Sequence, residues 1–279
     1  MRIRPTGDGG ADAVFRSATE ADDRSELIVD LSAVTFVVPG LVVAVGALVD
    51  EAVRHRAEVK FVPPASSAPA RYLERMDFGE FLDQCAVEHD LPEVVHHAWA
   101  SKERLCELTR FDNEQSARRI PELIFNKTED NDAIRADLSE NIYGAVWELL
   151  SNVFSHADIG HGFMAAQTYP GRLEICVSDR GRGILASFRD RGGAYQPDTH
   201  ADAILYAVQE RTTSLNTERG IGLSNLIRDI GRAAGAVQII SGNAAVNFRD
   251  GMPKRTLDVS FDGRGTTVSI KIPIGGAVP

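Results

Sequence analysis

Residues 27–49 form an almost unbroken apolar run that is long enough to cross a lipid bilayer. Two features interrupt the run, namely Asp30 near its start and the Pro39-Gly40 pair in its middle. The part before this pair is rich in β-branched residues, whereas Leu, Ala and Val dominate the part after it. A buried strand region, a turn and an apolar helix explain this division better than a membrane span does.

The neighbouring segments continue an alternation of strand and helix patterns. Residues 1–4 suit a short edge strand, and residues 41–56 carry a helical pattern that ends in cationic side chains. Residues 58–63 read as a second buried strand and residues 68–76 as a second helix. This order predicts an α/β unit in the first part of the chain.

Composition argues against several classes of protein. The formal net charge is −10 and no block of Lys and Arg reverses it, which disfavours a protein that coats nucleic acid. Cys85, Cys106 and Cys176 are too widely spaced for a metal motif or a disulfide framework, as is typical of a reducing compartment. The N-terminus lacks the apolar segment of a secretory signal. We therefore expect a cytoplasmic protein that does not act on membranes or nucleic acids.

The start of the chain resembles a STAS domain, the fold of anti-sigma-factor antagonists. The resemblance is carried by LIVDLSAVTFVVPGLVVAVGALVDEAVRHRAEVKFVPP and, further on, ARYLERMDF. STAS antagonists usually present a phosphorylatable Ser at the turn before the first long helix, where this chain has Val37-Val38-Pro39-Gly40. The resemblance thus implies a STAS-like domain over residues 1–84 that is not a phosphoacceptor and serves in docking or dimerisation. Residues 85–114 read as a helical connector.

A long helical pattern over residues 131–157 contains the stretch ELLSNVFSH, which begins at Glu148. Glu148 and Asn152 are four residues apart and therefore lie on one face of a helix. A carboxylate and a carboxamide placed in this way can orient a water molecule and ligate a hard cation. The same pair is also common on solvated helix faces, and this stretch alone leaves both interpretations open.

A first glycine motif follows a predicted strand over residues 172–178. It reads Asp179-Arg-Gly181-Arg-Gly183-Ile184. An Asp at a strand end can accept a hydrogen bond from an exocyclic amine, and the glycines let the backbone approach a ligand closely. Alone, this pattern is a weak signal, because many strand ends turn in this way.

A second glycine motif, Gly220-Ile-Gly222-Leu223, opens a predicted helix that ends near residue 234. A helix N-terminus with exposed backbone N–H groups can bind phosphate, although this spacing matches neither the dinucleotide fingerprint nor the Walker A loop. Residues 185–219, between the two motifs, are either a mobile lid with a helix at 200–211 or a plain surface loop. Strands are expected at 237–241, 245–248, 257–261 and 266–272, with residues 263–265 joining the last two.

The order of these motifs over residues 115–275 resembles the GHKL ATPases, which include gyrase, histidine kinases and the MutL mismatch-repair proteins. The resemblance implies a domain over residues 115–279 built as a two-layer α/β sandwich, with a mixed, mostly antiparallel sheet and helices on one face. The expected fold class of the whole chain is therefore α+β combined with α/β. The resemblance also implies ATP and Mg²⁺ as ligands.

Roles for individual residues follow from the same resemblance. Asn152 corresponds to the Mg²⁺ ligand, and Glu148 corresponds to the general base of the hydrolysing members or to a residue that positions water. Asp179 corresponds to the acceptor of the adenine amino group, and Thr266 to the residue that supports this contact through water. The other matching residues shape the adenine pocket (Gly181, Gly183, Ile184) or the phosphate side (Gly220, Gly222, Leu223).

Three functions fit these motifs. The first is a serine/threonine kinase of the anti-sigma-factor type that acts on a protein partner, such as a STAS antagonist, a sigma factor or a response regulator. The second is an orphan histidine-kinase catalytic domain. The third is a slow ATPase, or a switch in which ATP binding gates protein contacts. The missing STAS Ser and the absence of a phosphoacceptor His motif argue against phosphorylation of this chain itself. Kinases of this type are often homodimers.

Overall fold

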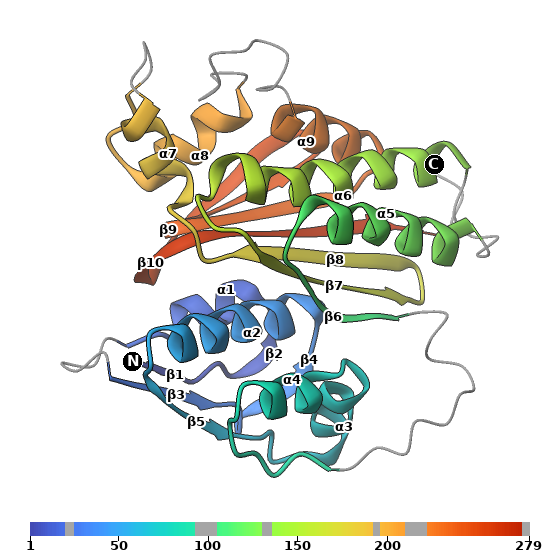
Figure 1. Cartoon of the computed structure of the whole chain (residues 1–279). Coiled ribbons are helices and arrows are strands. Elements are labelled where there is room, and N and C mark those ends of the chain that lie inside the picture. Colours follow the sequence, from blue (N-terminus) through green and yellow to red (C-terminus); the bar gives the residue numbers. More distant parts are fainter. Residues whose placement is uncertain (20–24, 93–104, 130–135, 192–195, 210–221, 275–279) are drawn as a thin grey trace.

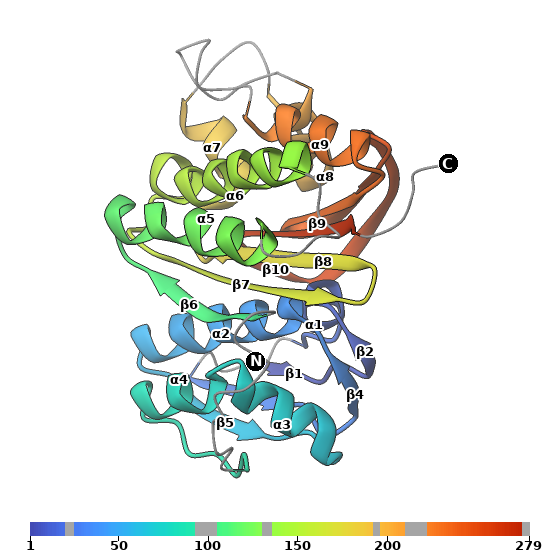
Figure 2. The same cartoon turned by 90° about the vertical axis from the view of Figure 1, so that its right-hand side faces the viewer.

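The computed structural model describes residues 1–19, 25–92, 105–129, 136–191, 196–209 and 222–274. These residues form two main sheets with a layer of helices between them (Figures 1 and 2). The first half of the chain contains β1 (Arg2–Ile3), β2 (Gly7–Gly9), α1 (Ala11–Arg16), β3 (Glu26–Asp30), β4 (Val34–Val37), α2 (Pro39–Arg54), β5 (Glu58–Val62), α3 (Ser67–Arg75) and α4 (Phe78–Gln84). The second half contains β6 (Leu105–Phe111), α5 (Glu114–Glu129), α6 (Ala136–His156), β7 (Gly162–Tyr169), β8 (Arg172–Asp179), α7 (Gly183–Arg191), α8 (His200–Val208), α9 (Gly222–Arg232), β9 (Ala236–Arg249) and β10 (Met252–Pro273).

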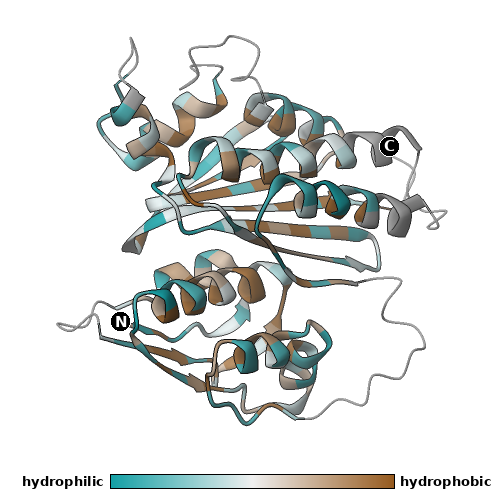
Figure 3. Cartoon of the chain, viewed as in Figure 1, coloured by the Kyte–Doolittle hydropathy of each residue, from teal (hydrophilic) through white to brown (hydrophobic). Residues whose placement is uncertain are grey.

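Helix α2 lies between the two sheets, and every residue from Pro39 to Asp50 is buried (Figure 1). Its apolar residues share one core with Val29 of β3 and with Phe163 and Ala165 of β7. A helix that is apolar on all sides has to be covered on all sides. Hydrophobic residues accordingly recur along α2 and along the strands above and below it (Figure 3). The apolar run at residues 27–49 therefore forms the centre of a folded core.

The predicted alternation of strand and helix in the first half is confirmed, and the whole chain has a mixed α/β fold. Strands β1, β3 and β5 form a parallel sheet in that order, and β2 pairs in parallel with β4. The expected burial of the second strand is wrong, because Glu58, Lys60 and Val62 of β5 are exposed. Within the described residues β5 pairs only with β3, so it is an edge strand.

Part of the predicted helical connector is a strand. Residues 105–111 form β6, which pairs antiparallel with β7 and lies at an edge of the second sheet. Cys106 and Phe111 of this strand are buried. The helical interpretation of this stretch was wrong because the pairing partner, β7, is far along the chain. Residues 93–104 of this connector lie outside the described part of the chain.

The second sheet is antiparallel throughout, with the strand order β6-β7-β8-β10-β9. Helices α5, α6 and α9 cover one face, as expected, and α1 and α2 cover the other (Figures 1 and 2). The other face is thus covered by helices from the first half of the chain. Within the described residues no helix is long and apolar enough to cross a membrane.

The last two strands are longer than predicted, and their turn lies elsewhere. Strands β9 and β10 are joined at Asp250 and Gly251, both of which have positive φ angles, 54° and 73°. An Asp-Gly pair favours a tight hairpin turn for this reason. The predicted turn at residues 263–265 was wrong. Gly263 and Gly265 lie inside β10, where the register with β9 shifts, as happens at a β-bulge.

The shared core predicts that the two halves of the chain unfold together. Leu48 of α2 is 1% exposed, and Leu48→Ala should lower the free energy of unfolding by about 2–5 kcal/mol through lost burial and a cavity. Chemical denaturation followed by circular dichroism should show one shifted transition. Met252→Ala, at a side chain that is 60% exposed, is the control and should change little. Two separate transitions, only one of them shifted, would contradict a shared core.

Candidate functional site

A pocket lies between α6 and α9, at the end of β8 and beneath α7 and α8. Its walls come from four helices, α6 to α9, and from the adjacent strands β8 and β10 of the antiparallel sheet. Polar groups are few and the remaining walls are apolar, as in many small-molecule sites. The lining residues are Glu148, Leu149, Asn152, Val153, His156, Ala157, Val177, Asp179, Gly183, Ile184, Ser187, Ala207, Gly222, Leu223, Thr266 and Val268.

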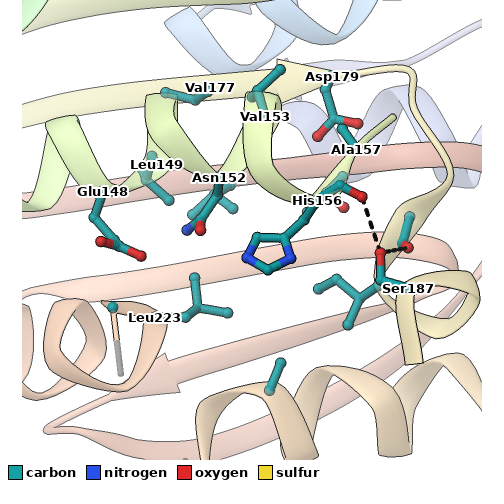
Figure 4. Close-up of a pocket in the computed structure, with 16 residues that line it drawn as sticks. Glu148, Leu149, Asn152, Val153, His156, Ala157, Val177, Asp179, Ser187 and Leu223 are labelled. Carbon is teal, nitrogen blue, oxygen red and sulfur yellow. Dashed lines mark hydrogen bonds between the residues drawn. The ribbon is translucent and has the colours of Figure 1, made fainter. Parts of the chain in front are cut away.

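Helix α6 supplies three of the polar side chains. Glu148, Asn152 and His156 are spaced by four residues, so they follow one another along a single helix face. All three line the pocket (Figure 4). Leu150 and Val146 are fully buried and anchor the same helix to the sheet. The anchored helix thus holds its polar row in a fixed position over the pocket.

Asp179 is the buried carboxylate of the site, with 6% of the residue exposed. It ends β8 and pairs in register with Thr266 of β10. The backbone N–H of Gly181 donates to its Oδ1 at 2.8 Å, and the backbone N–H of Thr266 also donates to this carboxylate. Burial nevertheless raises the pKa of Asp179 to about 6. The carboxylate is therefore held in place, but its ionised form is incompletely stabilised. A further hydrogen-bond donor would stabilise that form.

The turn after Asp179 needs its two glycines. A Cβ at Gly181 would overlap the carbonyl group of Ala157 at the end of α6. The backbone N–H of the next residue, Arg182, donates to that same carbonyl at 2.7 Å. Gly183 has a φ of +75°, which other residues rarely adopt. The motif thus brings the end of β8 against the end of α6 and then starts α7.

Ser241 of β9 connects this turn to the neighbouring strand β10. Its hydroxyl accepts from the backbone N–H of Ile184 at 3.0 Å and donates to the carbonyl of Gly265 at 3.1 Å. Ser241 also pairs in register with Thr266. Ser241 therefore links the first turn of α7 to β10 and holds Ile184 at the edge of the pocket.

Glu148 lies directly against the start of α9. A Cβ at Gly222 would overlap the Glu148 carboxylate, so any other residue there would require the Glu148 side chain to turn away. Burial raises the pKa of Glu148, and the hydrogen bond from the Asn152 side chain opposes that rise. Because the amide nitrogen of Asn152 donates to Glu148, its carbonyl oxygen is left for another donor or a cation. A carboxylate with a raised pKa is suited to proton transfer near neutral pH.

Eight of the ten residues selected from the sequence line this one pocket. They are Glu148, Asn152, Asp179, Gly183, Ile184, Gly222, Leu223 and Thr266. Gly181 does not line it but holds Asp179 through its backbone N–H. Gly220 lies outside the described residues. In the predicted lid or loop, residues 183–191 form α7 and residues 200–208 form α8, while 192–195 and 210–221 are not described.

Two serines were missed by sequence reasoning. Ser187 donates to the carbonyls of His156 at 3.1 Å and of Gly183 at 2.9 Å, and so ties α7 to α6. Ser241 was placed at the end of a strand without a role. Knowledge of the strand register would have revealed Ser241, because it is the cross-strand neighbour of Thr266. The contacts of Ser187 depend on α7, which was not predicted.

The donor set is compatible with a nucleotide and its cation. Among the described residues no three His, Cys, Asp or Glu side chains gather where they could hold a metal ion. Mg²⁺, however, is commonly held by one or two protein oxygens together with phosphates and waters. The carbonyl oxygen of Asn152 can be such a ligand. Glu148 and Gly222 lie close together at one end of the largely apolar pocket. The buried acceptor Asp179 lies at the other end.

Comparison with known proteins adds little. No family model matches the chain. No curated protein matches it either. Among solved structures the chain is similar to the SiaB–SiaC complex from Pseudomonas aeruginosa, with 14% identity over 61% of this chain and 91% of that chain and a TM-score of 0.32. A similarity at this level supports no conclusion about fold or function. The function proposed for this chain is therefore inferred from the arrangement of its own residues.

The raised pKa of Asp179 predicts a pH-dependent cost in stability. The folded chain binds this proton more tightly than the unfolded chain, whose Asp has the ordinary pKa of 3.8. The contribution of Asp179 to the free energy of unfolding therefore falls as pH rises from about 4 to about 6. Without nucleotide, Asp179→Asn should raise the melting temperature at pH 8, and the gain should vanish below pH 4.

Calorimetric scans across this pH range check that expectation. Asp258→Asn is the matched control, because Asp258 is exposed and lies on β10, the strand that pairs with Asp179. It should change the melting temperature little at any pH. A gain for Asp179→Asn that is equal at pH 4 and pH 8 would contradict the assignment of the cost to a buried charge.

Proposed function

We propose that this protein binds ATP with Mg²⁺ in the pocket under α6, in the manner of the GHKL ATPases that its motifs resemble. The observation that carries the proposal is the position of Asp179. Its buried carboxylate is held by two backbone N–H groups and lines a largely apolar pocket. Such a group accepts the amino group of adenine, while Val153 and Ile184 supply apolar surface for the base.

The opposite end of the pocket suits the phosphates. Helix α9 begins at Gly222, and the backbone N–H groups at a helix N-terminus favour anions. Asn152 would ligate Mg²⁺ through its carbonyl oxygen, and the cation would neutralise charge on the phosphate oxygens. Adenine at Asp179 and phosphates at Gly222 would give the nucleotide one orientation across the face of α6.

Glu148 favours phosphoryl transfer over binding alone. Burial raises its pKa, as is common in general bases. In the proposed reaction Glu148 takes the proton of a hydroxyl group, the hydroxyl oxygen bonds to the γ-phosphorus, and the bond to ADP breaks. The acceptor hydroxyl belongs to a Ser or Thr of a partner protein, and water replaces it slowly when the partner is absent. The protein would thus be a regulatory kinase in signalling.

The first half of the chain favours a substrate hydroxyl on another protein over one on this chain. At the position where STAS antagonists present their phosphoacceptor, Val38, Pro39 and Gly40 have no hydroxyl and line a cavity against β9 and β10. Ser269 and Lys271 of β10 line that cavity too, whereas Val268 lines the pocket on the opposite face. The STAS-like half would therefore not be the substrate, and a STAS antagonist, sigma factor or response regulator would take that role.

Calorimetric titration with a non-hydrolysable ATP analogue and Mg²⁺ tests the binding. Wild type should bind, and Asp179→Ala should lose most of the affinity because the adenine amino group loses its buried acceptor. Asp258→Ala, at an exposed position of β10, is the matched control and should bind like wild type. Absence of binding by wild type, or binding by Asp179→Ala equal to that of wild type, would refute the proposal.

Incubation with γ-labelled ATP tests the chemistry. Wild type alone should release labelled phosphate slowly, and Glu148→Gln should reduce the rate at least about a hundredfold because the general base is lost. The variant should still bind the analogue. Glu114→Gln, which removes an exposed carboxylate from α5, should keep the wild-type rate. Label on the chain itself would instead indicate autophosphorylation, and an unchanged rate in Glu148→Gln would exclude this residue as the base.

A further inference from the structure

One partly buried ion pair connects α2 to the turn that follows Asp179. The Nε and a terminal nitrogen of Arg180 both lie 2.7 Å from Oε2 of Glu51. The Arg180 side chain is only 4% exposed and that of Glu51 is 21% exposed. Charge-assisted bonds of this geometry, removed from water, hold both partners strongly in position. Glu51 is therefore a fixed neighbour of the glycine motif, although it lies 129 positions earlier in the chain.

Arg180 and Asp179 face opposite sides of the sheet. Successive residues of a strand alternate between faces. Val177 and Asp179 line the pocket on the α6 side, whereas Cys176 belongs to the core that α2 shares. Gly265 packs against the backbone of both residues, because a Cβ there would overlap the Asp179 carbonyl group. A displacement of Arg180 would therefore displace the carboxylate next to it.

Asp50, a second acidic residue of α2, strengthens the contact between this helix and the antiparallel sheet. Asp50, which is 4% exposed, lies 2.9 Å from the imidazole of His161 and 2.5 Å from the guanidinium of Arg110. It also bonds Arg54 of its own helix at 2.8 Å. His161 precedes β7 and Arg110 belongs to β6, so Asp50 fixes α2 against the edge of the same sheet. Asp50 thus fixes the position of α2 on the sheet, and Glu51 binds Arg180 in the turn that follows Asp179.

We propose that Glu51 is a positioning residue for the nucleotide site, and that through it the first half of the chain sets nucleotide affinity. This inference rests on the proposed ATP binding. Loss of the Glu51 charge removes two short charge-assisted bonds from a guanidinium that is almost fully buried, so the turn loses an anchor. The coupling is reciprocal: bound nucleotide, by holding Asp179, strengthens the contact of α2 with the sheet.

Two measurements on Glu51→Gln test the inference. Affinity for the ATP analogue should fall about tenfold, within the usual range for coupled sites. Backbone amide exchange of residues 180–184 without nucleotide should accelerate about tenfold, because the turn loses its anchor. Glu26→Gln is the matched control: it removes an ion pair with Lys60 inside the first sheet and should change neither quantity.

A double mutant tests whether Glu51 acts on the nucleotide site through Arg180. If Glu51 acts through Arg180, the Glu51→Gln/Arg180→Gln protein should bind no more weakly than Arg180→Gln alone. Additive losses would overturn that route. A lower melting temperature for Glu51→Gln with unchanged affinity and unchanged exchange would overturn the positioning role, since the pair would then be only structural. If wild type fails to bind nucleotide, the proposed function falls, and amide exchange still decides whether Glu51 holds the turn.

Discussion

The burial of α2 is the constraint on which the rest of this structure depends. A helix with every residue from Pro39 to Asp50 buried has no face that can be left in water. Each methylene group exposed would cost about 0.8 kcal/mol, so the helix requires an apolar surface on both sides. The parallel sheet supplies one and the antiparallel sheet the other (Figure 2). The two halves of the chain are consequently one folding unit, with residues from both in a single core.

The polar end of the same helix determines how the halves are aligned. Apolar packing is non-directional, so it would tolerate small shifts of α2 across the sheet. Buried charges do not, because each needs a partner at a defined distance. Asp50 and Glu51 meet His161, Arg110 and Arg180 of the other half. The alignment that satisfies them places the end of α2 beneath the end of β8, on the face opposite the pocket.

Local patterns, read together with the order of the motifs, were enough to select residues that line one pocket. Glu148 and Asn152 follow from helix spacing, and Asp179 follows from its position at a strand end. The contacts of Ser241 and Glu51 could not be predicted, because they depend on strand register and on the packing of α2. Strand β6 was missed for the same reason. The hairpin turn is different: Asp250-Gly251 is a strong local signal that was overlooked in favour of Gly263 and Gly265.

The pocket contains charges that weaken the free chain. Burial raises the pKa of both Glu148 and Asp179, so each ionised carboxylate costs stability at neutral pH. The rest of the structure compensates for that cost, since Asp179 keeps two backbone donors and α6 is anchored by its buried apolar face. Groups held in this state gain most from a ligand that supplies the missing donor or cation. The same buried position therefore makes Asp179 unfavourable in the free chain and, in the proposed complex, would make it selective for the amino group of the nucleotide.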